Sequence, residues 1–241
     1  GKTRLAGFFA NVNYSYANRY LLDLSARLDG SSMYGSESKF SPFWAVGLGW
    51  NIHHEKFMEN TGISRLKIRG SIGTTGKASF QPYQSQTMFE YIQDGWYATG
   101  IGATLMALGN PNLKWEETRQ FNVELDLSFL DNRIGINGTL YLKKTEDCFT
   151  TVQVSSVNGV PGHSYVMNGG NLENNGYSVG LSGVPVKTRD WQWNLYTYFS
   201  GNLNKVRSQT VEKYTIDSYL NGTALVDGEA VSSFYSYRFL G

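Results

Sequence analysis

The sequence contains few of the residues on which small scaffolds and catalytic centres commonly depend. A single cysteine, Cys148, among 241 residues excludes a disulfide within the chain. There are three histidines, and none stands at zinc-ligand spacing from Cys148, which argues against a cysteine-based metal site. The 21 basic and 20 acidic residues leave a net charge of +1, so no attraction to nucleic acid or to an acidic surface is expected.

Long hydrophobic runs are absent as well. No continuous apolar stretch approaches the roughly 18 residues that a membrane-spanning helix requires. This does not exclude a membrane-spanning β-barrel, because its strands alternate lipid-facing and interior-facing residues and therefore contain no long apolar run. Charged residues make up only 17% of the chain, aromatic residues make up 15%, and there are 27 glycines. This composition is typical of a β-rich chain with many loops.

The clearest periodic signal lies in residues 118–144. Every second residue is apolar from Phe121 to Phe129 and again from Ile134 to Leu142, apart from Gly138, and polar residues fill most positions between them. Successive side chains of a strand point to opposite faces of a sheet. Residues 130–133 supply Asp and Asn for a tight turn. The segment therefore predicts an antiparallel hairpin with one apolar and one polar face.

Similar alternation recurs along most of the chain and predicts about eight strands. The other alternating segments are residues 6–16, 20–28, 42–52, 66–72, 177–181 and 191–199. Residues 53–64 are expected to form a short helical or irregular connection. Two long stretches without a sustained period, Thr74 to Glu117 and Thr145 to Asn175, are expected to be long loops. Short and long connections then alternate, with the long ones on one side of the sheet.

Alternation alone does not say whether the apolar face meets a protein core or lipid. Strands of about ten residues, tilted by about 45°, rise roughly 23 Å, close to the ~25 Å apolar band of an outer-membrane barrel. Long loops on one edge and tight turns on the other are also typical of such barrels. Aromatic residues lie near strand ends, as expected at a membrane interface: Tyr14, Tyr16, Tyr20, Trp44, Trp50, Trp191 and Trp193. We therefore predict an all-β fold, an antiparallel transmembrane β-barrel segment with short periplasmic turns and long extracellular loops.

Two short motifs suggest a metal site and a phosphate-binding loop, but neither has the required residues. His53, His54 and Glu55 could be metal ligands, but adjacent histidines point in different directions and no third ligand follows at zinc spacing. The stretch around Lys77 resembles a phosphate-binding loop, but Ser71 occupies the position of the first glycine. No metal site and no cofactor are predicted.

The polar row of the 118–144 hairpin has two interpretations. Glu124 and Asp126 stand two residues apart on one face, so a paired acid and base site is geometrically conceivable. Asn122 and Ser128 continue the same row, which favours a polar lining of a barrel lumen. We predict that Asn122, Glu124, Asp126 and Asn137 line the lumen and that no residue is catalytic.

The long stretch before this hairpin combines aromatic rings with hydrogen-bonding side chains. Such a combination suits an oligosaccharide or a peptide, because rings cover apolar patches and polar groups orient the ligand. The candidate ligand-binding residues are Tyr83, Tyr91, Asp94, Trp96 and Tyr97. The alternative, which we favour for these rings, is packing of the loop or contact with a partner protein.

Four stretches of the chain resemble motifs of the SusC/RagA family of TonB-dependent outer-membrane transporters. They are "YLLDLSARLDGSSMYG" (20–35), "FSPFWAVGLGWNIHHEKFM" (40–58), "ISRLKIRGSIGTTGKASFQPYQS" (63–85) and the segment 109–149. The last stretch carries "NPNLKWE", similar to the N-P-x-L-K-W-E motif of the family, and the hairpin that follows it. The resemblance extends over nearly the whole chain.

The resemblance implies a fold, a function and partners. The family has a 22-stranded barrel, so residues 1–241 are expected to be a single segment from the later part of that barrel, without the plug domain. It implies uptake of oligosaccharides or peptides across the bacterial cell outer membrane, not enzymatic activity. The implied partners are a SusD-like surface lipoprotein, outer-membrane lipid and the TonB complex, which would act through the missing plug. A soluble β-rich carbohydrate-binding module is the alternative.

Overall fold

A computed structural model gives the fold of the chain. It describes residues 4–33, 39–77, 84–97, 100–155, 157, 159–160, 164–210, 214, 216–222 and 224–238, without the side chains of 93–97 and 153. The strands of the main sheet are β1 (Leu5–Tyr16), β2 (Tyr20–Ser31), β3 (Phe40–Asn51), β4 (Ile63–Lys77), β7 (Glu116–Phe129), β8 (Ile134–Gln153), β9 (Ser164–Gly183) and β10 (Leu195–Gln209). Strands β5 (Met88–Tyr97) and β6 (Gly100–Ala107) form a separate hairpin. A short helix, α1 (Ile216–Leu220), follows β10.

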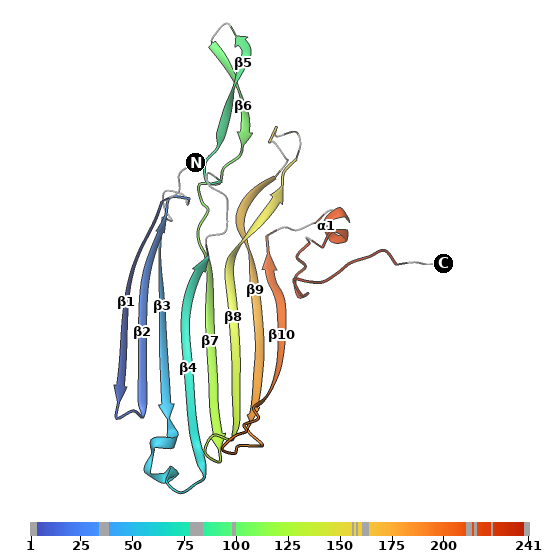
Figure 1. Ribbon diagram of the computed structural model, residues 1–241. Helices are drawn as coiled ribbons and strands as arrows, with labels where there is room; N and C mark the ends of the chain where they lie inside the picture. The colour runs from blue at the N-terminus through green and yellow to red at the C-terminus, as the bar shows by residue number, and fades with distance from the viewer. Residues whose placement is uncertain are drawn as a thin grey trace.

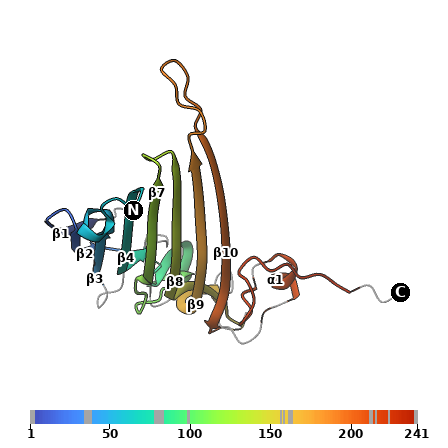
Figure 2. The same ribbon diagram turned by 90° about the horizontal axis from the view of Figure 1, so that it is seen from below.

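The main sheet is antiparallel and open. Its order is β1-β2-β3-β4-β7-β8-β9-β10, so β1 and β10 lie at opposite edges (Figures 1 and 2). Only the excursion through β5 and β6 interrupts the sequence order, and β4 pairs with β7 along its full length, from Ile63↔Phe129 to Lys77↔Glu116. The eight predicted strands and their antiparallel arrangement are confirmed.

The connections at the two ends of the sheet differ. At the lower end in Figure 1, β1 turns into β2 through Ala17 and Asn18, and β7 turns into β8 through residues 130–133. Both turns use backbone with positive φ. The φ angles are 51° at Ala17 and 54° at Asn18 in the first turn, and 52°, 54° and 62° at residues 130, 131 and 132 in the second. The β3–β4 connection contains two short 3-10 turns, η1 (Ile52–His54) and η2 (Lys56–Met58), as predicted. No helix in the described ranges has the length and apolar character needed to cross a membrane.

Two predicted loops are wrong in extent. The first was expected at Thr145 to Asn175, but β8 and β9 each run for 20 residues and stay paired to Gln153↔Ser164. Register shifts on either side of Cys148, next to Asp147 with φ 58°, break the alternation that would have revealed the strands.

The second loop, expected from Thr74 to Glu117, is also more regular than the sequence indicates. Strand β4 continues to Lys77, and β5 and β6 form an antiparallel hairpin that projects beyond the main sheet (Figure 1). Two register shifts in this hairpin, between Met88 and Phe89 and between Tyr91 and Trp96, explain why its alternation is poor.

One face of the main sheet carries an apolar band. We define it by every second side chain, mainly apolar, in a nine-residue stretch of each of five strands. These stretches are residues 8–16, 20–28, 121–129, 134–142 and 195–203, and neighbouring apolar residues of β3, β4 and β9 complete the band. Its side chains stay open to the surroundings, with exposed fractions of 67% for Phe8, 61% for Leu140 and 79% for Leu203. The described chain therefore forms a single layer over this face. A soluble β-sandwich would instead bury such a face against a second sheet.

The small buried core lies above the sheet, at the base of the β5–β6 hairpin. Leu113 is fully buried and packs against Met33, Trp115, Phe149 and Val166. These residues come from the β2–β3 connection, the segment before β7, β8 and β9. The "NPNLKWE" motif therefore closes the upper end of the sheet.

Hydrogen bonds hold the same motif in place. The Asn168 side chain accepts from the Lys114 backbone N–H at 3.0 Å and donates to the Lys114 and Asp147 carbonyls at 2.9 and 2.8 Å. The Lys114 ammonium lies 2.7 Å from the Asp147 carboxylate. The Asn110 side chain donates to the Val166 carbonyl at 3.1 Å. The base of the hairpin is thus tied to β8 and β9 by both packing and polar contacts.

Candidate functional site

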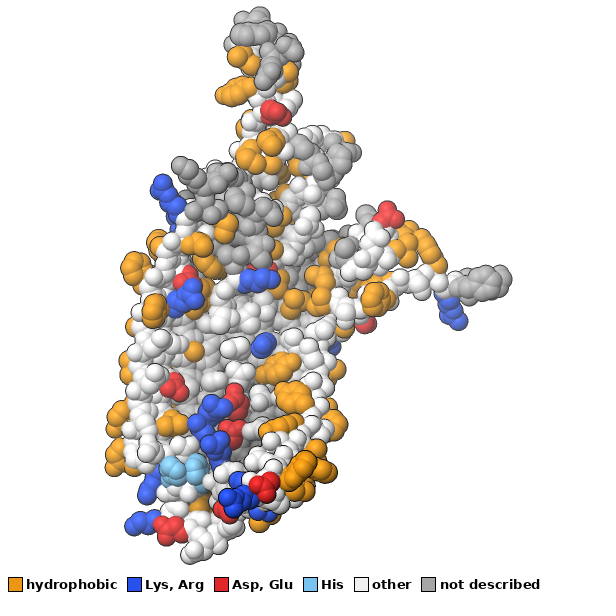
Figure 3. All heavy atoms as spheres, in the orientation of Figure 1, with side chains coloured by type: hydrophobic (Ala, Val, Ile, Leu, Met, Phe, Trp, Pro, Cys, Tyr) orange, Lys and Arg blue, Asp and Glu red, His pale blue; other side chains and the backbone are white. Residues whose placement is uncertain are grey.

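The face opposite the apolar band is polar, and its centre holds a network of charged side chains. Arg69 on β4 approaches Glu124 on β7 at 2.6 Å and Asp126 at 3.8 Å. The Asn137 amide on β8 donates to Asp126 at 2.8 Å. The space-filling view shows basic and acidic side chains together in the middle of this face, over β4 and β7, with apolar side chains gathered towards the lateral edges (Figure 3). The register explains the network, because Arg69 is the cross-strand partner of Glu124 and Asn137 is that of Asp126.

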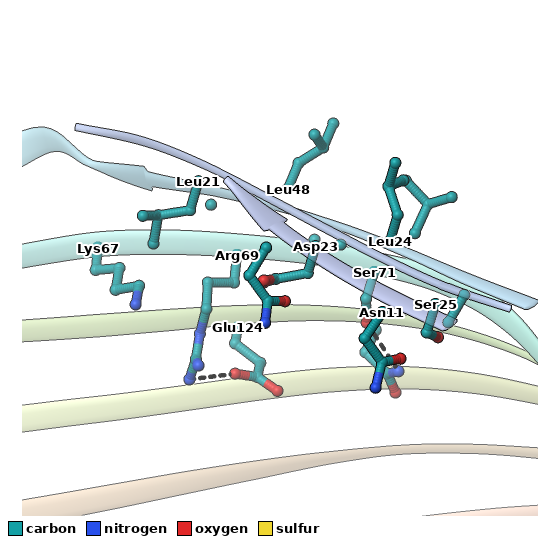
Figure 4. A pocket seen from close by; sticks show the side chains of 17 residues that line it. Asn11, Leu21, Asp23, Leu24, Ser25, Leu48, Lys67, Arg69, Ser71 and Glu124 are labelled. Atoms are coloured by element: carbon teal, nitrogen blue, oxygen red, sulfur yellow. Dashed lines mark hydrogen bonds and ion pairs between the residues drawn. The ribbon is translucent and has the colours of Figure 1, made fainter. Parts of the chain in front are cut away.

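A hollow of about 320 Å³ runs beside this network. Its floor is β3, where Ala45, Gly47 and Gly49 place little or no side chain on the polar face. Asp23 stands on one side of the hollow and Lys67 on the other, with Arg69 and Glu124 in contact below (Figure 4). Neither Asp23 nor Lys67 forms an ion pair with another described residue.

The structure brings together all four residues predicted to line a lumen. Asn122, Glu124, Asp126 and Asn137 lie on the same polar face, and Asn122 donates to Ser71 at 3.2 Å. Whether this face lines a lumen in the whole protein stays a prediction. Arg69 is not among the residues predicted to line the lumen, although the alternation in "RLKIRGS" places it on the polar face.

Four of the five predicted ligand-binding residues, Tyr91, Asp94, Trp96 and Tyr97, lie on β5, whose hairpin with β6 projects away from the charged network on β4 and β7 (Figure 1). Tyr91 is 73% exposed, so its ring does not pack against the rest of the described chain. Asp94, Trp96 and Tyr97 belong to β5, but their side chains are outside the description, and Tyr83 lies outside the described residues. Other apolar residues of the hairpin are exposed too, including Phe89 at 64%. Tyr91 thus does not pack within the described residues, and contact of this hairpin with a ligand or with a partner protein stays a prediction.

The histidines of the β3–β4 connection have structural contacts. The rings of His53 and His54 lie 4.2 Å apart edge to face, and Nδ1 of His53 is 3.0 Å from the Leu66 carbonyl. Within the described ranges, no group of three potential metal ligands comes together.

Glu55, the third residue of that motif, joins the lower ends of the strands. Its carboxylate accepts hydrogen bonds from Trp50 Nε1 at 3.1 Å and from the Tyr20 hydroxyl at 2.9 Å, and Arg19 approaches it at 3.4 Å. The hydrogen bonds from Trp50 and Tyr20, together with the Arg19 charge, lower the pKa of the Glu55 carboxyl below its usual value. Glu55 therefore fixes two aromatic residues at the lower ends of β2 and β3 in place.

Comparisons with known proteins agree with this architecture. The family model described as TonB dependent receptor-like, beta-barrel, matches residues 1–238. The chain is 33% identical over 253 residues to TonB-dependent receptor P3 of Formosa agariphila, covering 100% of this chain and 25% of that protein. It is 30% identical over 256 residues to TonB-dependent receptor SusC of Bacteroides thetaiotaomicron, covering 98% of this chain and 25% of that protein. The chain thus spans about a quarter of the length of these relatives.

Solved structures show the same fold. The RagAB peptide importer in its "open-open" state superposes with a TM-score of 0.80 at 26% identity, covering 89% of this chain and 23% of that chain. The alcaligin outer membrane receptor FauA of Bordetella pertussis, at 15% identity, has a TM-score of 0.51 and covers 88% of this chain and 32% of that chain, a likeness of fold alone. The relatives are named as receptors and importers, and the SusC/RagA resemblance is confirmed. The chain therefore belongs to the TonB-dependent receptor-like β-barrel family and is a stretch of barrel wall in the bacterial outer membrane.

Proposed function

We propose that this chain is a single segment of the barrel wall of a TonB-dependent importer that carries oligosaccharides or peptides across the outer membrane. The observation that supports it best is the pair of unlike faces on one open sheet. The apolar band suits lipid, and the charged network around Arg69 and Glu124 suits a water-filled interior. The similarity to SusC and to the RagAB peptide importer supports both the transport role and the two substrate classes.

The proposed role is binding and passage of a substrate rather than its chemical conversion. Asn122, Glu124, Asp126 and Asn137 would line the interior, where ion pairs and amides stay hydrated and give the wall its polarity. Energy would come from the TonB complex acting on other parts of the full-length protein. The partner at the outer surface would be a SusD-like lipoprotein.

The β5–β6 hairpin is our candidate for contact with substrate or with that lipoprotein. Its exposed apolar side chains, Phe89, Tyr91 and Met106, belong to a hairpin that projects beyond the upper end of the main sheet (Figure 1). Such a projecting surface fits a contact site better than a free loop, because exposed aromatic clusters commonly mark interaction sites. Asp94, Trp96, Tyr97 and Tyr83 are proposed as part of the same surface.

The transport proposal is tested with the full-length protein in its own host. A strain that lacks the gene is expected to lose uptake of a subset of labelled oligosaccharides or peptides, and uptake in the wild type should stop when a protonophore removes the energy for TonB. Restoring the gene should restore uptake. Unchanged uptake of every tested member of both substrate classes would contradict the proposal.

The contact surface is tested separately by substitution. The double variant Phe89→Ser/Tyr91→Ser should reduce copurification of the SusD-like lipoprotein or uptake of substrate, while the barrel stays in the membrane. Glu90→Gln is the matched control, since Glu90 lies between the two aromatic residues on β5. Equal lipoprotein recovery and equal uptake in all three proteins would remove the hairpin from the proposal.

A further inference from the structure

A row of charged residues borders the apolar band at its upper end. On β7, β8 and β10 the band ends at Phe121, Leu142 and Leu203, and the next residues on the same face are Arg119, Lys144 and Lys205. Arg119 is the cross-strand partner of Lys144, and Glu173 of β9 is the cross-strand partner of both Lys144 and Lys205. We define the charged row by these four partners: Arg119, Lys144, Glu173 and Lys205.

The single acidic member of the charged row is already neutralised. The Glu173 carboxylate accepts a hydrogen bond from Arg207 Nε at 2.6 Å and another from the Asn175 amide at 2.7 Å, and its side chain is only 13% exposed. Lys144 and Lys205 flank Glu173 on the neighbouring strands, and neither forms an ion pair with another described residue. Two exposed lysines thus stand on either side of a carboxylate that already has hydrogen-bond partners.

The other end of the charged row behaves differently. Arg119 lies 3.0 Å from Glu117 and 3.6 Å from Glu146, so its charge is shared between two carboxylates. The surplus of positive charge is therefore local to β8 and β10, at Lys144 and Lys205. This location matters because it coincides with a depression in the apolar band.

An apolar hollow of about 570 Å³ lies directly below these two lysines. Its walls are side chains of the apolar band, mainly Phe121, Leu142, Tyr177 and Leu203, and Gly201 leaves room between them. The hollow opens to the side that faces lipid. A cationic rim above an apolar depression is complementary to a lipid, which has a phosphate head and an acyl tail.

The height of the row agrees with this arrangement. Nine residues per strand at about 3.3 Å each, tilted by about 40°, rise roughly 23 Å, which matches the ~25 Å apolar girdle of outer-membrane barrels. The charged row follows immediately, at the end of the sheet that carries the β5–β6 hairpin, which lies in the longest connection between strands of the main sheet, and the longer loops of such barrels face outwards. It is therefore at the level of the headgroups of the outer leaflet.

We propose that Lys144 and Lys205, with the hollow beneath them, form a binding site for a phosphorylated lipid of the outer leaflet. Each ammonium is a compact cation with three donors that suits a phosphate oxygen, and the phosphate takes the place that an acidic side chain would otherwise fill. An acyl chain lies against Phe121, Leu142 and Leu203. The lipid thus contacts both the exposed lysines and the open apolar surface, which a soluble phosphate does not.

The test uses the full-length protein in detergent, stripped of lipid, with phosphorylated lipid A as the probe. The double variant Lys144→Gln/Lys205→Gln should bind it about tenfold or more weakly than the wild type. Lys143→Gln is the matched control, because Lys143 is on the same strand but on the opposite face, over the Tyr141 ring. The charge-preserving variant Lys144→Arg/Lys205→Arg should bind within a few-fold of the wild type.

Two further probes separate the sources of phosphate. Dephosphorylated lipid A, which keeps the acyl chains, should bind the wild type as weakly as phosphorylated lipid A binds the double Gln variant. Inorganic phosphate should not compete at the same concentrations. Equal binding by Lys143→Gln and the double Gln variant, equal binding of dephosphorylated lipid A to the wild type, or competition by inorganic phosphate would each overturn the proposal.

Failure of the charge-preserving variant would overturn it too, because the effect would then not follow charge. Unfolding is monitored by the electrophoretic shift of heated and unheated barrel. The proposal does not rest on the transported substrate, so uptake by the double Gln variant can remain at the wild-type level.

Discussion

The ring of Tyr177 on β9 occupies the space beside Gly201, its cross-strand partner on β10. An added Cβ on Gly201 would lie 2.6 Å from a ring carbon of Tyr177. The same relationship occurs on the polar face, where a Cβ on Gly176 would lie 2.4 Å from the ring of Tyr141 on β8. Each ring covers the backbone of the neighbouring strand, so β8, β9 and β10 are joined by side chains on both faces as well as by backbone hydrogen bonds.

Substitution of Gly201 by Ala is expected to displace the Tyr177 ring. The close contact would have to be relieved by moving either the ring or the strand, at a cost of about 1–3 kcal/mol in the free energy of unfolding. The measurement is the urea midpoint of the full-length protein in vesicles. Gly138→Ala is the control, because no atom lies within 4 Å of an added Cβ at that site. Equal midpoints for the two variants would show that the Tyr177 contact has no energetic role.

The sequence predicts the faces of the sheet well because side chains alternate with a strict period of two. Phe121 to Phe129 and Ile134 to Leu142 were assigned to one face, and the structure confirms the assignment. The alternation is lost above the apolar band, in the upper parts of β8 and β9. Above the apolar band the side chains no longer separate into an apolar and a polar face, and the bulge near Asp147 shifts the register, so the upper parts of β8 and β9 carry no readable pattern.

The sequence does not predict that Arg69 is the partner of the predicted site residue Glu124. Alternation assigns Arg69 to a face, but it does not set the register between β4 and β7. That register depends on how the long excursion through β5 and β6 closes, with Lys77 opposite Glu116. Only the structure shows that closure, and with it the ion pair between Arg69 and Glu124.

The assignment of the two faces can be tested by chemical labelling in intact outer membranes. In a Cys148→Ser background, cysteines at Asn122 and Glu124 should react with a small water-soluble maleimide, because they face the polar hollow. Cysteines at Val123 and Leu125, on the apolar band, should be labelled at least several-fold more slowly, since lipid excludes the reagent. Faster labelling at Val123 and Leu125 than at Asn122 and Glu124 would reverse the assignment.

Leu113 is expected to control the rigidity of the β5–β6 hairpin. Leu113→Ala removes the centre of a fully buried cluster and should cost about 2–5 kcal/mol locally, because a cavity remains among Met33, Phe149 and Val166. The hairpin should then exchange its backbone amides faster and be cut more readily by protease, while the lower part of the sheet is unchanged. Leu108→Ala is the control, since Leu108 is 37% exposed. Comparable protection of the hairpin in both variants would refute the anchoring role.

Glu55 should make part of the stability dependent on pH. Its pKa is lowered in the folded protein by hydrogen bonds from Trp50 and Tyr20 and by Arg19, so the folded state binds the proton less readily than the unfolded state. This contribution is fully present above the ordinary value of 4.5 and is lost as the pH falls through the lower folded value. The urea midpoint of the wild type should therefore drop more between pH 6 and pH 3, an interval of roughly three units around that carboxyl, than the midpoint of Glu55→Gln. Glu59→Gln is the control, because Glu59 is exposed in the same connection, and its urea midpoint should fall with pH as in the wild type. If the midpoint of Glu55→Gln also falls with pH as in the wild type, the loss of stability comes from other carboxyl groups and the assignment to Glu55 is contradicted.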